Sequence, residues 1–211
     1  MKGKFIVAEG LDGTGKSSVL NEIKLLLSDE DTLIFTREPG GLNDSITESI
    51  RNLILEESTE IDPLTEAYLF SASRARHTNE IKKLLDKGKT VICDRYIYSS
   101  LYYQGIMKNL GTKTVFDINK TALNEIKPDI ILYFVTSDEV RNQRIQKRNE
   151  INRFDKEVMK VSSLGASIEY LNVIHLYKTK KTKVEIKDTS STTPDEAAQK
   201  MFQILLENKC I

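Results

Sequence analysis

Short apolar runs alternate with longer stretches that carry apolar residues at helical spacing along this chain of 211 residues. The short runs predict strands near residues 4–8, 32–36, 90–93, 130–135 and 183–186. The longer stretches predict helices over residues 16–27, 43–55, 64–87 (continuous or broken), 98–106, 115–125, 139–150, 156–177 and 194–207. Strands that are mostly apolar are typical of a parallel sheet buried on both faces. We therefore expect an α/β fold, a three-layer sandwich in which helices cover both faces of a five-stranded parallel sheet.

Polar residues directly follow several of the predicted strands. The glycine-rich segment Gly10–Ser17 follows the first strand, Arg37 the second, and Asp94 with Arg95 the third. In a sheet of this kind the carboxyl ends of the strands form one rim, and ligands bind there. We expect these side chains to converge on one cleft.

The segment Gly10–Ser17 reads GLDGTGKS and fits the pattern G-x-x-x-x-G-K-[ST] between a strand and a helix. Its glycines allow backbone N–H groups to turn inward, and the next helix directs its positive end toward the same hollow. We expect Lys16 to reach the β- and γ-phosphates of ATP, and the Ser17 hydroxyl to hold Mg²⁺. The predicted contacts to the ATP phosphates are Gly10, Asp12, Gly13, Thr14, Gly15, Lys16, Ser17 and Ser18. A glycine-rich turn before an ordinary helix is the alternative.

Asp94 ends an apolar strand, where its carboxylate would hold Mg²⁺ directly or through water. Arg95 follows it, and Arg37 ends another strand. Two guanidinium groups in these places would hold one monophosphate through paired hydrogen bonds. The alternative is that both arginines are exposed and form solvent-screened ion pairs.

A basic segment of about residues 138–155 predicts a short lid on a single domain of residues 1–211. Arg141, Arg144 and Arg148 share one face of its helix, where like charges repel unless an anion binds between them. A lid that closes over a transferring phosphoryl group would supply that charge and exclude water. A basic surface that serves only solubility is the alternative.

Two segments favour an organic ligand as well as phosphates. Phe70 and Arg74 are four residues apart on one predicted helix, and an aromatic ring beside a guanidinium suits a flat heterocycle with carbonyl oxygens. Ser100, Tyr103 and Gln104 follow Asp94 closely, and the Gln104 amide offers paired hydrogen bonds to a pyrimidine edge. Packing of Phe70 into the core is the alternative.

The 31 basic and 31 acidic residues give no overall attraction to nucleic acid or to a membrane. No apolar stretch is long enough for a membrane span, and the first residues enter a strand directly, so we expect a cytoplasmic protein. Cys93 lies in a predicted buried strand and is expected to fill the core. The cysteine count supports neither a disulfide framework nor a structural zinc site.

The order of these motifs resembles the thymidylate kinase family over residues 4–155. The resemblance depends on Gly10–Ser17, the run Arg-Glu-Pro-Gly-Gly at 37–41, Phe70 with Arg74, and the run from Asp94 through Ser99-Ser100 to Tyr103-Gln104-Gly105. It implies a P-loop kinase, commonly a homodimer, in which an arginine lid assists transfer of the γ-phosphoryl group of ATP to dTMP.

The resemblance also implies a role for each matching residue. Phe70 stacks on thymine, Arg74 contacts a base carbonyl, and Gln104 and Ser100 bond the base edge. Tyr103 lies near the sugar and disfavours a 2′-hydroxyl. Asp12 faces the 3′-hydroxyl, and the acceptor region is surrounded by Arg37, Arg51 and Arg95. Some members carry an arginine where this chain has Gly13, so here the lid supplies the charge, from Arg144, Lys147 and Arg153. The catalytic residues so implied are Lys16, Arg95, Arg144 and Arg153.

Other functions are compatible with a phosphate loop. One alternative is a kinase of the same build that acts on another acceptor, such as dUMP or a deoxynucleoside. A GTPase-like switch protein needs an Asn-Lys-x-Asp element, and the run Asn-Lys-Thr-Ala at 119–122 lacks the aspartate. A nucleotide-binding subunit without turnover is a third alternative.

Overall fold

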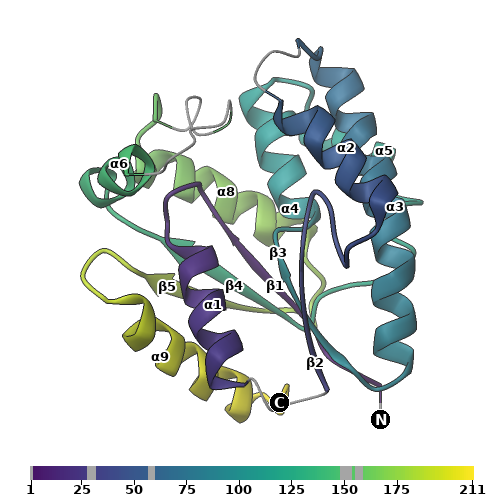
Figure 1. The fold of residues 1–211 in the computed structure, drawn as a ribbon. Coiled ribbons are helices and arrows are strands. Elements are labelled where there is room, and N and C mark those ends of the chain that lie inside the picture. Colours follow the sequence, from purple (N-terminus) through teal and green to yellow (C-terminus); the bar gives the residue numbers. More distant parts are fainter. Residues whose placement is uncertain (1, 28–31, 57–59, 148–153, 155–158) are drawn as a thin grey trace.

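The computed structural model describes residues 2–27, 32–56, 60–147, 154 and 159–211. The described strands form one parallel sheet of five strands in the order β2-β3-β1-β4-β5 (Figure 1). Their bounds are β1 (Phe5–Gly10), β2 (Leu33–Arg37), β3 (Thr90–Asp94), β4 (Ile130–Val135) and β5 (Lys183–Asp188). The predicted strands and their parallel arrangement are confirmed.

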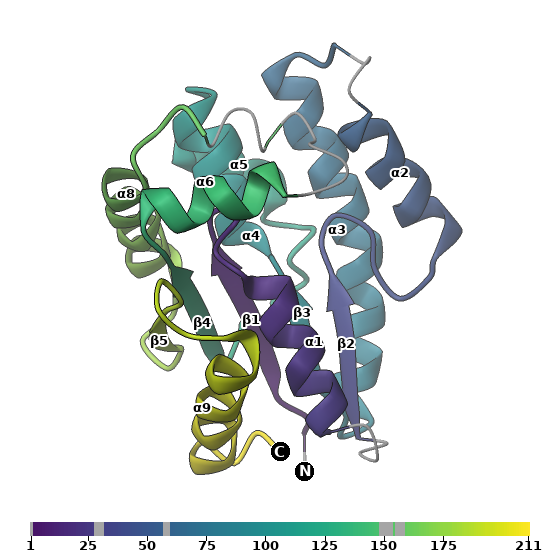
Figure 2. The same cartoon turned by 60° about the vertical axis from the view of Figure 1, so that its left-hand side comes forward.

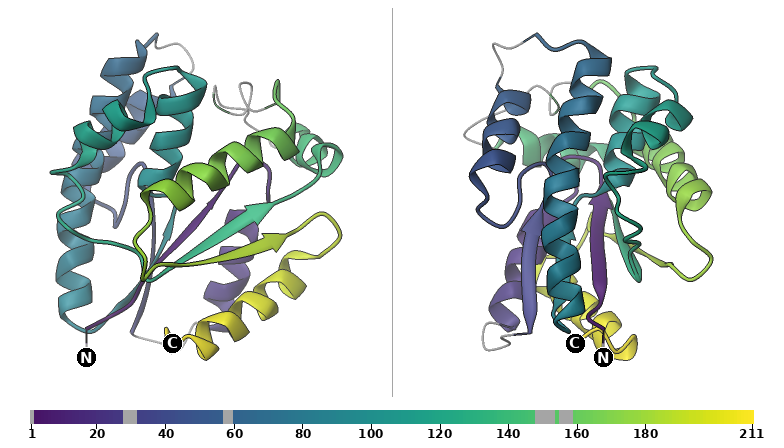
Figure 3. Two further views of the ribbon diagram at one scale, coloured as in Figure 1. Left: turned by 180° about the vertical axis from the view of Figure 1, so that it is seen from behind. Right: turned by 90° about the vertical axis from the view of Figure 1, so that its right-hand side faces the viewer.

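Helices cover both faces of this sheet. Seen from behind, α8 crosses in front of the sheet while α1 and α9 lie behind it (Figure 3). The helices of the described residues are α1 (Lys16–Leu26), α2 (Ser45–Leu55), α3 (Pro63–Asp86), α4 (Ile97–Ser100), the π-helix η1 (Leu101–Met107), α5 (Thr112–Asn119), α6 (Asp138–Gln146), α8 (Ser163–Tyr177) and α9 (Pro194–Glu207). None of them is long and apolar enough to cross a membrane.

The alternation of side chains along β1 divides the core into two parts. Phe5 and Val7 belong to a cluster that includes residues of α3, α4, η1, α5 and α8. Ile6 and Ala8 point to the other face and pack in a cluster with α1 and α9. Because both faces of the strand are covered, each of its residues is apolar up to position 8. Cys93 is fully buried in the first cluster, which confirms the predicted core position.

Local signals explain where several helices begin. Asp62 caps α3 through its side chain, and Pro63 occupies the first helical turn. Thr193 and Glu196 form a capping box at the start of α9. Each such cap contributes about 1 kcal/mol.

Three of the predicted helices differ from the structure. The helix expected over 98–106 is divided into α4 and the π-helix η1. The helix expected over 115–125 begins at Thr112 and ends at Asn119, and its predicted end was wrong because Asn124 and Glu125 take positive φ values of 45° and 63°. The helix expected from residue 156 begins at Ser163 among the described residues, and α3 is continuous.

The carboxyl ends of the strands meet at one edge of the sheet. Register pairs place Asp94 beside Ala8 and also beside Arg37, and place Gly10 beside Phe134. Figure 2 shows α6 lying across this edge, above the start of α1. The residues that follow β1 and β3 therefore share one region, as the sequence predicts.

Candidate active site

Glycines of the loop between β1 and α1 take positive φ values, and two of them also lack space for a side chain. Gly10 has a φ of 141°, and a Cβ there would lie 2.4 Å from the carbonyl oxygen of Phe134. Gly13 has a φ of 80°, and a Cβ there would lie 2.8 Å from Cγ of Arg141. Other residues would be strained and would collide with these neighbours. The loop thus wraps tightly around a small hollow at the start of α1.

Lys16 lies within this loop with its ammonium group turned inward. Nζ donates to the carbonyl oxygens of Gly10 at 2.9 Å and of Leu11 at 2.8 Å. Burial lowers the pKa of Lys16 to about 8, and the positive charge of Arg95 acts in the same direction. An anion placed beside a buried ammonium group stabilises its charged form. A bound phosphate would be such an anion.

Ser17 and Asp94 bring two oxygen ligands to the same hollow. The Ser17 hydroxyl donates to Oδ2 of Asp94 at 2.9 Å. Oδ1 of Asp94 is buried and has no hydrogen-bond partner among the residues that the structure describes. A hydroxyl beside a carboxylate oxygen that needs a partner fits Mg²⁺, which prefers oxygen ligands. These residues fit the predicted metal position.

Arg95 and Asp12 form an ion pair beside the loop. Nη2 of Arg95 lies 2.7 Å from Oδ1 of Asp12, while the Tyr103 hydroxyl donates to Oδ2 at 2.9 Å. Arg95 takes a φ of 69°, outside the usual range for a residue with a side chain. This backbone turn directly after β3 is a strained feature of the kind that clusters at functional sites. Burial and the charge of Asp12 raise the pKa of Tyr103, which therefore stays a hydrogen-bond donor.

Glu9 is a functional candidate that the sequence analysis missed. It is fully buried and accepts hydrogen bonds from the Tyr96 amide at 2.8 Å, the Ser99 hydroxyl at 2.7 Å and the Tyr170 hydroxyl at 2.6 Å. Ser99 in turn accepts from Nη1 of Arg95 at 3.0 Å. Burial raises the pKa of the Glu9 carboxyl, against the effect of these hydrogen bonds. The only sequence signal was one acid within an otherwise apolar strand.

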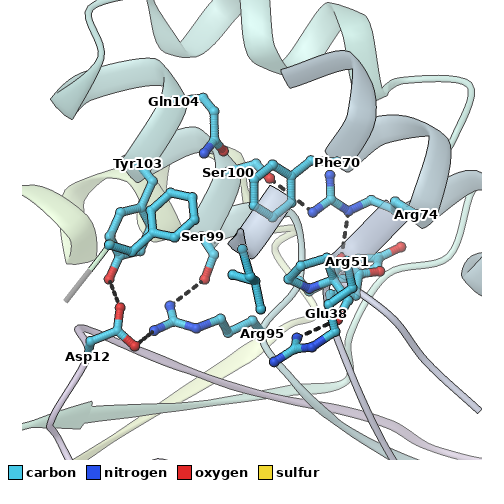
Figure 4. Close-up of a pocket in the computed structure, with 14 residues that line it drawn as sticks. Asp12, Glu38, Arg51, Phe70, Arg74, Arg95, Ser99, Ser100, Tyr103 and Gln104 are labelled. Atoms are coloured by element: carbon cyan, nitrogen blue, oxygen red, sulfur yellow. Dashed lines mark hydrogen bonds and ion pairs between the residues drawn. The ribbon is translucent and has the colours of Figure 1, made fainter. Parts of the chain in front are cut away.

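A second hollow, which we call the side cavity, opens next to the loop (Figure 4). It holds about 620 Å³ of empty space, part of it open to solvent. It is lined by Asp12, Glu38, Pro39, Arg51, Leu55, Phe70, Arg74, Arg95, Tyr96, Ser99, Ser100, Tyr103, Gln104 and Phe154.

The side cavity brings together most of the residues predicted to bind the acceptor. Asp12, Arg51, Phe70, Arg74, Arg95, Ser100, Tyr103 and Gln104 all line it. Arg37 does not line it, because its guanidinium pairs with Glu48 at 3.0 Å and its side chain is 53% exposed. The monophosphate contact predicted for Arg37 therefore stays a prediction, while Arg51 occupies the wall of the cavity.

Arg74 is fixed by partners on three sides. Its Nε donates to Glu38 at 2.8 Å, Nη2 donates to Ser100 at 3.0 Å, and Nη1 donates to Asn119. Glu38 also lies 3.2 Å from Nδ1 of His77. The sequence analysis includes Glu38 in the motif at 37–41 but assigns it no role. This network holds the Arg74 side chain at the wall of the side cavity.

The arginines of α6 have different roles in the structure. Arg144 donates to Oγ1 and to the carbonyl oxygen of Thr189, both at 2.9 Å, and a Cβ on Gly15 would lie 3.2 Å from its Nη1. Arg141 is buried, pairs with Asp138 and donates to the carbonyl oxygen of Val161. The prediction that both face one anion was therefore wrong for Arg141. Lys147 is exposed, whereas Arg148 and Arg153 lie outside the described residues.

The loop surrounds a smaller hollow, which we call the phosphate hollow. Its lining comprises Asp12, Gly13, Gly15, Lys16, Ser17, Ser18, Asp94 and Arg95. Asp12 and Arg95 line both hollows. The ion pair between them therefore stands where a ligand in one hollow would meet a ligand in the other.

Comparison with known proteins gives consistent findings. The family model described as "Thymidylate kinase" matches residues 8–197. The thymidylate kinase of Ligilactobacillus salivarius is 43% identical over 165 residues, covering 75% of this chain and 78% of that protein. That of Limosilactobacillus reuteri is 36% identical over 197 residues, covering 90% of each.

Solved structures show the same fold. The crystal structure of thymidylate kinase from Ehrlichia chaffeensis superposes with a TM-score of 0.72 and 24% identity, covering 98% of this chain and 100% of that one. The thymidylate kinase of Candida albicans gives a TM-score of 0.71 and 23% identity, with 99% and 93% covered.

Proposed function

The chain belongs to the thymidylate kinase family, and from this premise we propose that it transfers the γ-phosphoryl group of ATP to dTMP, giving dTDP and ADP. The observation that carries the proposal is that the phosphate hollow and the side cavity share Asp12 and Arg95 as a common wall. Phosphoryl transfer needs two nucleotides aligned end to end with their charges neutralised. Two adjoining hollows with a guanidinium between them meet that need.

The triphosphate of ATP fits the phosphate hollow. The loop N–H groups and the start of α1 favour an anion, and Lys16 supplies an ammonium group within the hollow. Ser17 and Asp94 would hold Mg²⁺, which, when bound, neutralises charge on the phosphates. Arg144 stands beside Gly15 and brings a further positive charge to this side.

The acceptor nucleotide fits the side cavity. Phe70 offers a ring face to a base, while Arg74, Ser100 and Gln104 provide polar groups along the same wall. Asp12 and Tyr103 line the same cavity and would lie near the sugar, where Tyr103 would disfavour a 2′-hydroxyl. The phosphate of dTMP would then lie against Arg95 and Arg51, next to the phosphate hollow.

In the transfer step an oxygen of the dTMP phosphate attacks the γ-phosphorus, and the bond to the bridging β–γ oxygen breaks. The attacking oxygen is already deprotonated at neutral pH, so the reaction requires no general base from the protein. Charge spreads over the transferring group in the transition state. Lys16, Arg95 and Arg144 approach this group from different sides and stabilise that charge.

Other features inferred from the sequence remain predictions. These are a single domain with a lid near residues 138–155, a catalytic role for Arg153, a homodimer, a cytoplasmic location, and the absence of nucleic-acid and membrane partners. The alternative of a guanine-reading switch gains no support from Asn119, because this side chain is buried and accepts a hydrogen bond from Arg74.

An ADP-release assay across nucleoside monophosphates and deoxynucleosides tests the proposal. We expect ATP-dependent turnover that is fastest with dTMP. Faster turnover with dUMP or with a deoxynucleoside would reassign the acceptor, and the absence of turnover with every acceptor would favour a non-catalytic nucleotide-binding protein.

A further inference from the structure

The amide of Gln104 faces the side cavity with one polar atom that has no partner among the described residues. Gln104 lies on η1 and its side chain is 1% exposed. Its Oε1 is buried and accepts no hydrogen bond from any residue that the structure describes. Figure 4 shows the amide end of Gln104 turned toward the side chains of Phe70 and Tyr103. A buried acceptor of this kind is costly, and a ligand that donates a hydrogen bond to it recovers the cost.

Glu66 determines which atom of the amide faces the cavity. Nε2 of Gln104 donates to Oε1 of Glu66 at 2.7 Å. An ionised carboxylate only accepts hydrogen bonds, so the amide must turn its Nε2 toward Glu66 and its Oε1 away. The opposite orientation would bring two acceptors together. The sequence analysis did not identify Glu66, because its contact with Gln104 spans 38 residues.

Lys108 keeps this arrangement in place. Glu66 is fully buried, and Nζ of Lys108 lies 2.7 Å from its Oε2. A buried carboxylate is stable only when paired, and the ammonium group supplies the opposite charge. Glu66 therefore remains an acceptor, and Gln104 keeps its orientation.

The orientation of the Gln104 amide determines which bases the side cavity accepts. Thymine and uracil carry a hydrogen on N3 and can donate it to Oε1 of Gln104. Cytosine has an unprotonated N3, which is an acceptor and would face Oε1 with repulsion. A site built around a buried hydrogen-bonding group rejects a ligand that leaves the group unpaired.

We propose that Glu66 is a specificity-determining positioning residue, which fixes the Gln104 amide so that the side cavity selects 4-oxopyrimidine nucleotides over 4-aminopyrimidine nucleotides. This inference rests on the proposed function and adds a residue that does not line the cavity. It predicts selection for the class that contains thymine and uracil, whereas discrimination between these two bases depends on the 5-methyl group.

A double-mutant cycle tests the inference. kcat/KM for dTMP and for dCMP is measured in the wild type, Glu66→Gln, Gln104→Ala and the double variant. A glutamine side chain at position 66 both donates and accepts hydrogen bonds, so the Gln104 amide can turn either its Nε2 or its Oε1 toward it. We expect the dTMP-to-dCMP ratio to fall on the order of 10- to 100-fold in Glu66→Gln, mainly through KM. In the Gln104→Ala background the same change should alter the ratio by less than about twofold.

Two results would overturn the inference: an unchanged ratio in Glu66→Gln, or an equal fall whether or not Gln104 is present. The second result would mean that Glu66 supports the cavity without acting through the amide. Thermal unfolding establishes that each variant is folded. If Glu66→Gln does not fold, the paired variant Glu66→Met with Lys108→Met removes both charges and takes its place, with the same expected fall in the ratio.

A binding measurement separates this inference from the proposed function. Calorimetry with dTMP and with N3-methyl dTMP on the wild type requires no turnover. Binding of dTMP at least about tenfold tighter is expected, and equal binding would overturn the contact to Oε1. If dTMP binds selectively but is not phosphorylated, the proposed function fails while the contact to Gln104 stands, and the same binding measurement on Glu66→Gln then decides the role of Glu66.

Discussion

Nη2 of Arg95 lies 2.7 Å from Oδ1 of Asp12, and this ion pair is part of the wall between the phosphate hollow and the side cavity. Because Arg95 lines both hollows, we expect its guanidinium to contact both substrates. Ser99 and, through it, Glu9 hold the same guanidinium from the other side.

Arg95→Ala should lower kcat/KM for dTMP by at least about 100-fold, because the acceptor phosphate loses its paired donors and Asp12 loses its ion pair with Arg95. Arg95→Lys keeps the charge but not the planar fork, so a smaller loss is expected. Steady-state kinetics measures both. Arg76→Lys is a matched control, since Arg76 is 53% exposed and pairs with Asp44 on the surface. A comparable loss in the control would contradict the assignment.

Lys16→Ala should lower kcat by about 100- to 1,000-fold, because it removes a charge from the side where the β- and γ-phosphates lie. Single-turnover kinetics at saturating ATP and dTMP isolates the transfer step. The exposed Lys24 on the same helix provides a control, and Lys24→Ala should turn over as the wild type does. Near wild-type transfer in Lys16→Ala would refute the role of this residue.

ATP binding should be linked to proton uptake at alkaline pH. The pKa of Lys16 is lowered to about 8 in the free protein, and a bound phosphate restores the charged form and raises the pKa. Affinity for ATP should therefore be highest below pH 8 and fall as the pH rises through about 8. Calorimetry in buffers with different ionisation enthalpies measures the uptake. Lys16→Met should abolish this uptake, and an equal uptake in that variant would assign the proton to another group.

Asp94→Asn should raise the Mg²⁺ concentration needed for half-maximal activity by about tenfold, because a neutral amide replaces the carboxylate. Titration of activity with Mg²⁺ at constant ATP gives this value. Asp86→Asn serves as the control, since Asp86 is exposed and pairs with Lys2 far from the hollow. An unchanged Mg²⁺ requirement in Asp94→Asn would remove Asp94 from the predicted metal site.

Glu9→Gln should lower the free energy of unfolding by about 1–3 kcal/mol, since an amide cannot accept all the hydrogen bonds that the carboxylate accepts. Burial raises the pKa of Glu9 above its ordinary value of 4.5, so the folded state holds this proton more tightly. The protonated Glu9 carboxyl therefore contributes to the free energy of unfolding below pH 4.5, and this contribution is lost as the pH rises through the raised pKa of the folded state. Urea unfolding measured from pH 4.5 upward should show a smaller fall in the free energy of unfolding for Glu9→Gln than for the wild type. Glu207→Gln, on the exposed end of α9, should behave as the wild type.

Sequence reasoning predicted which candidate residues come together at the ends of the strands. The loop after β1 lies beside Asp94, which ends β3, and Arg95, which follows it, because parallel pairing brings strand ends together whatever the details of packing. The partners that fix these groups could not be found in this way. Glu9 meets Tyr170 across 161 residues, and Gln104 meets Glu66 across 38, so both contacts depend on how helices pack.

The departures from prediction have local physical causes. Arg37 turns outward because its guanidinium forms an ion pair with Glu48 on α2. Arg141 packs against Gly13 and pairs with Asp138 instead of facing an anion with Arg144. The π-helix η1 replaces an expected α-helix in the segment that carries Tyr103 and Gln104, and such helices occur frequently at functional sites.

A crystal structure of the protein with dTMP and a non-hydrolysable ATP analogue is the most direct test of the central claim. The account predicts the triphosphate in the phosphate hollow against Lys16, the base of dTMP beside Phe70 in the side cavity, and the dTMP phosphate in contact with Arg95. Two nucleotides bound apart from each other, or a guanidinium of Arg95 directed away from both, would contradict it.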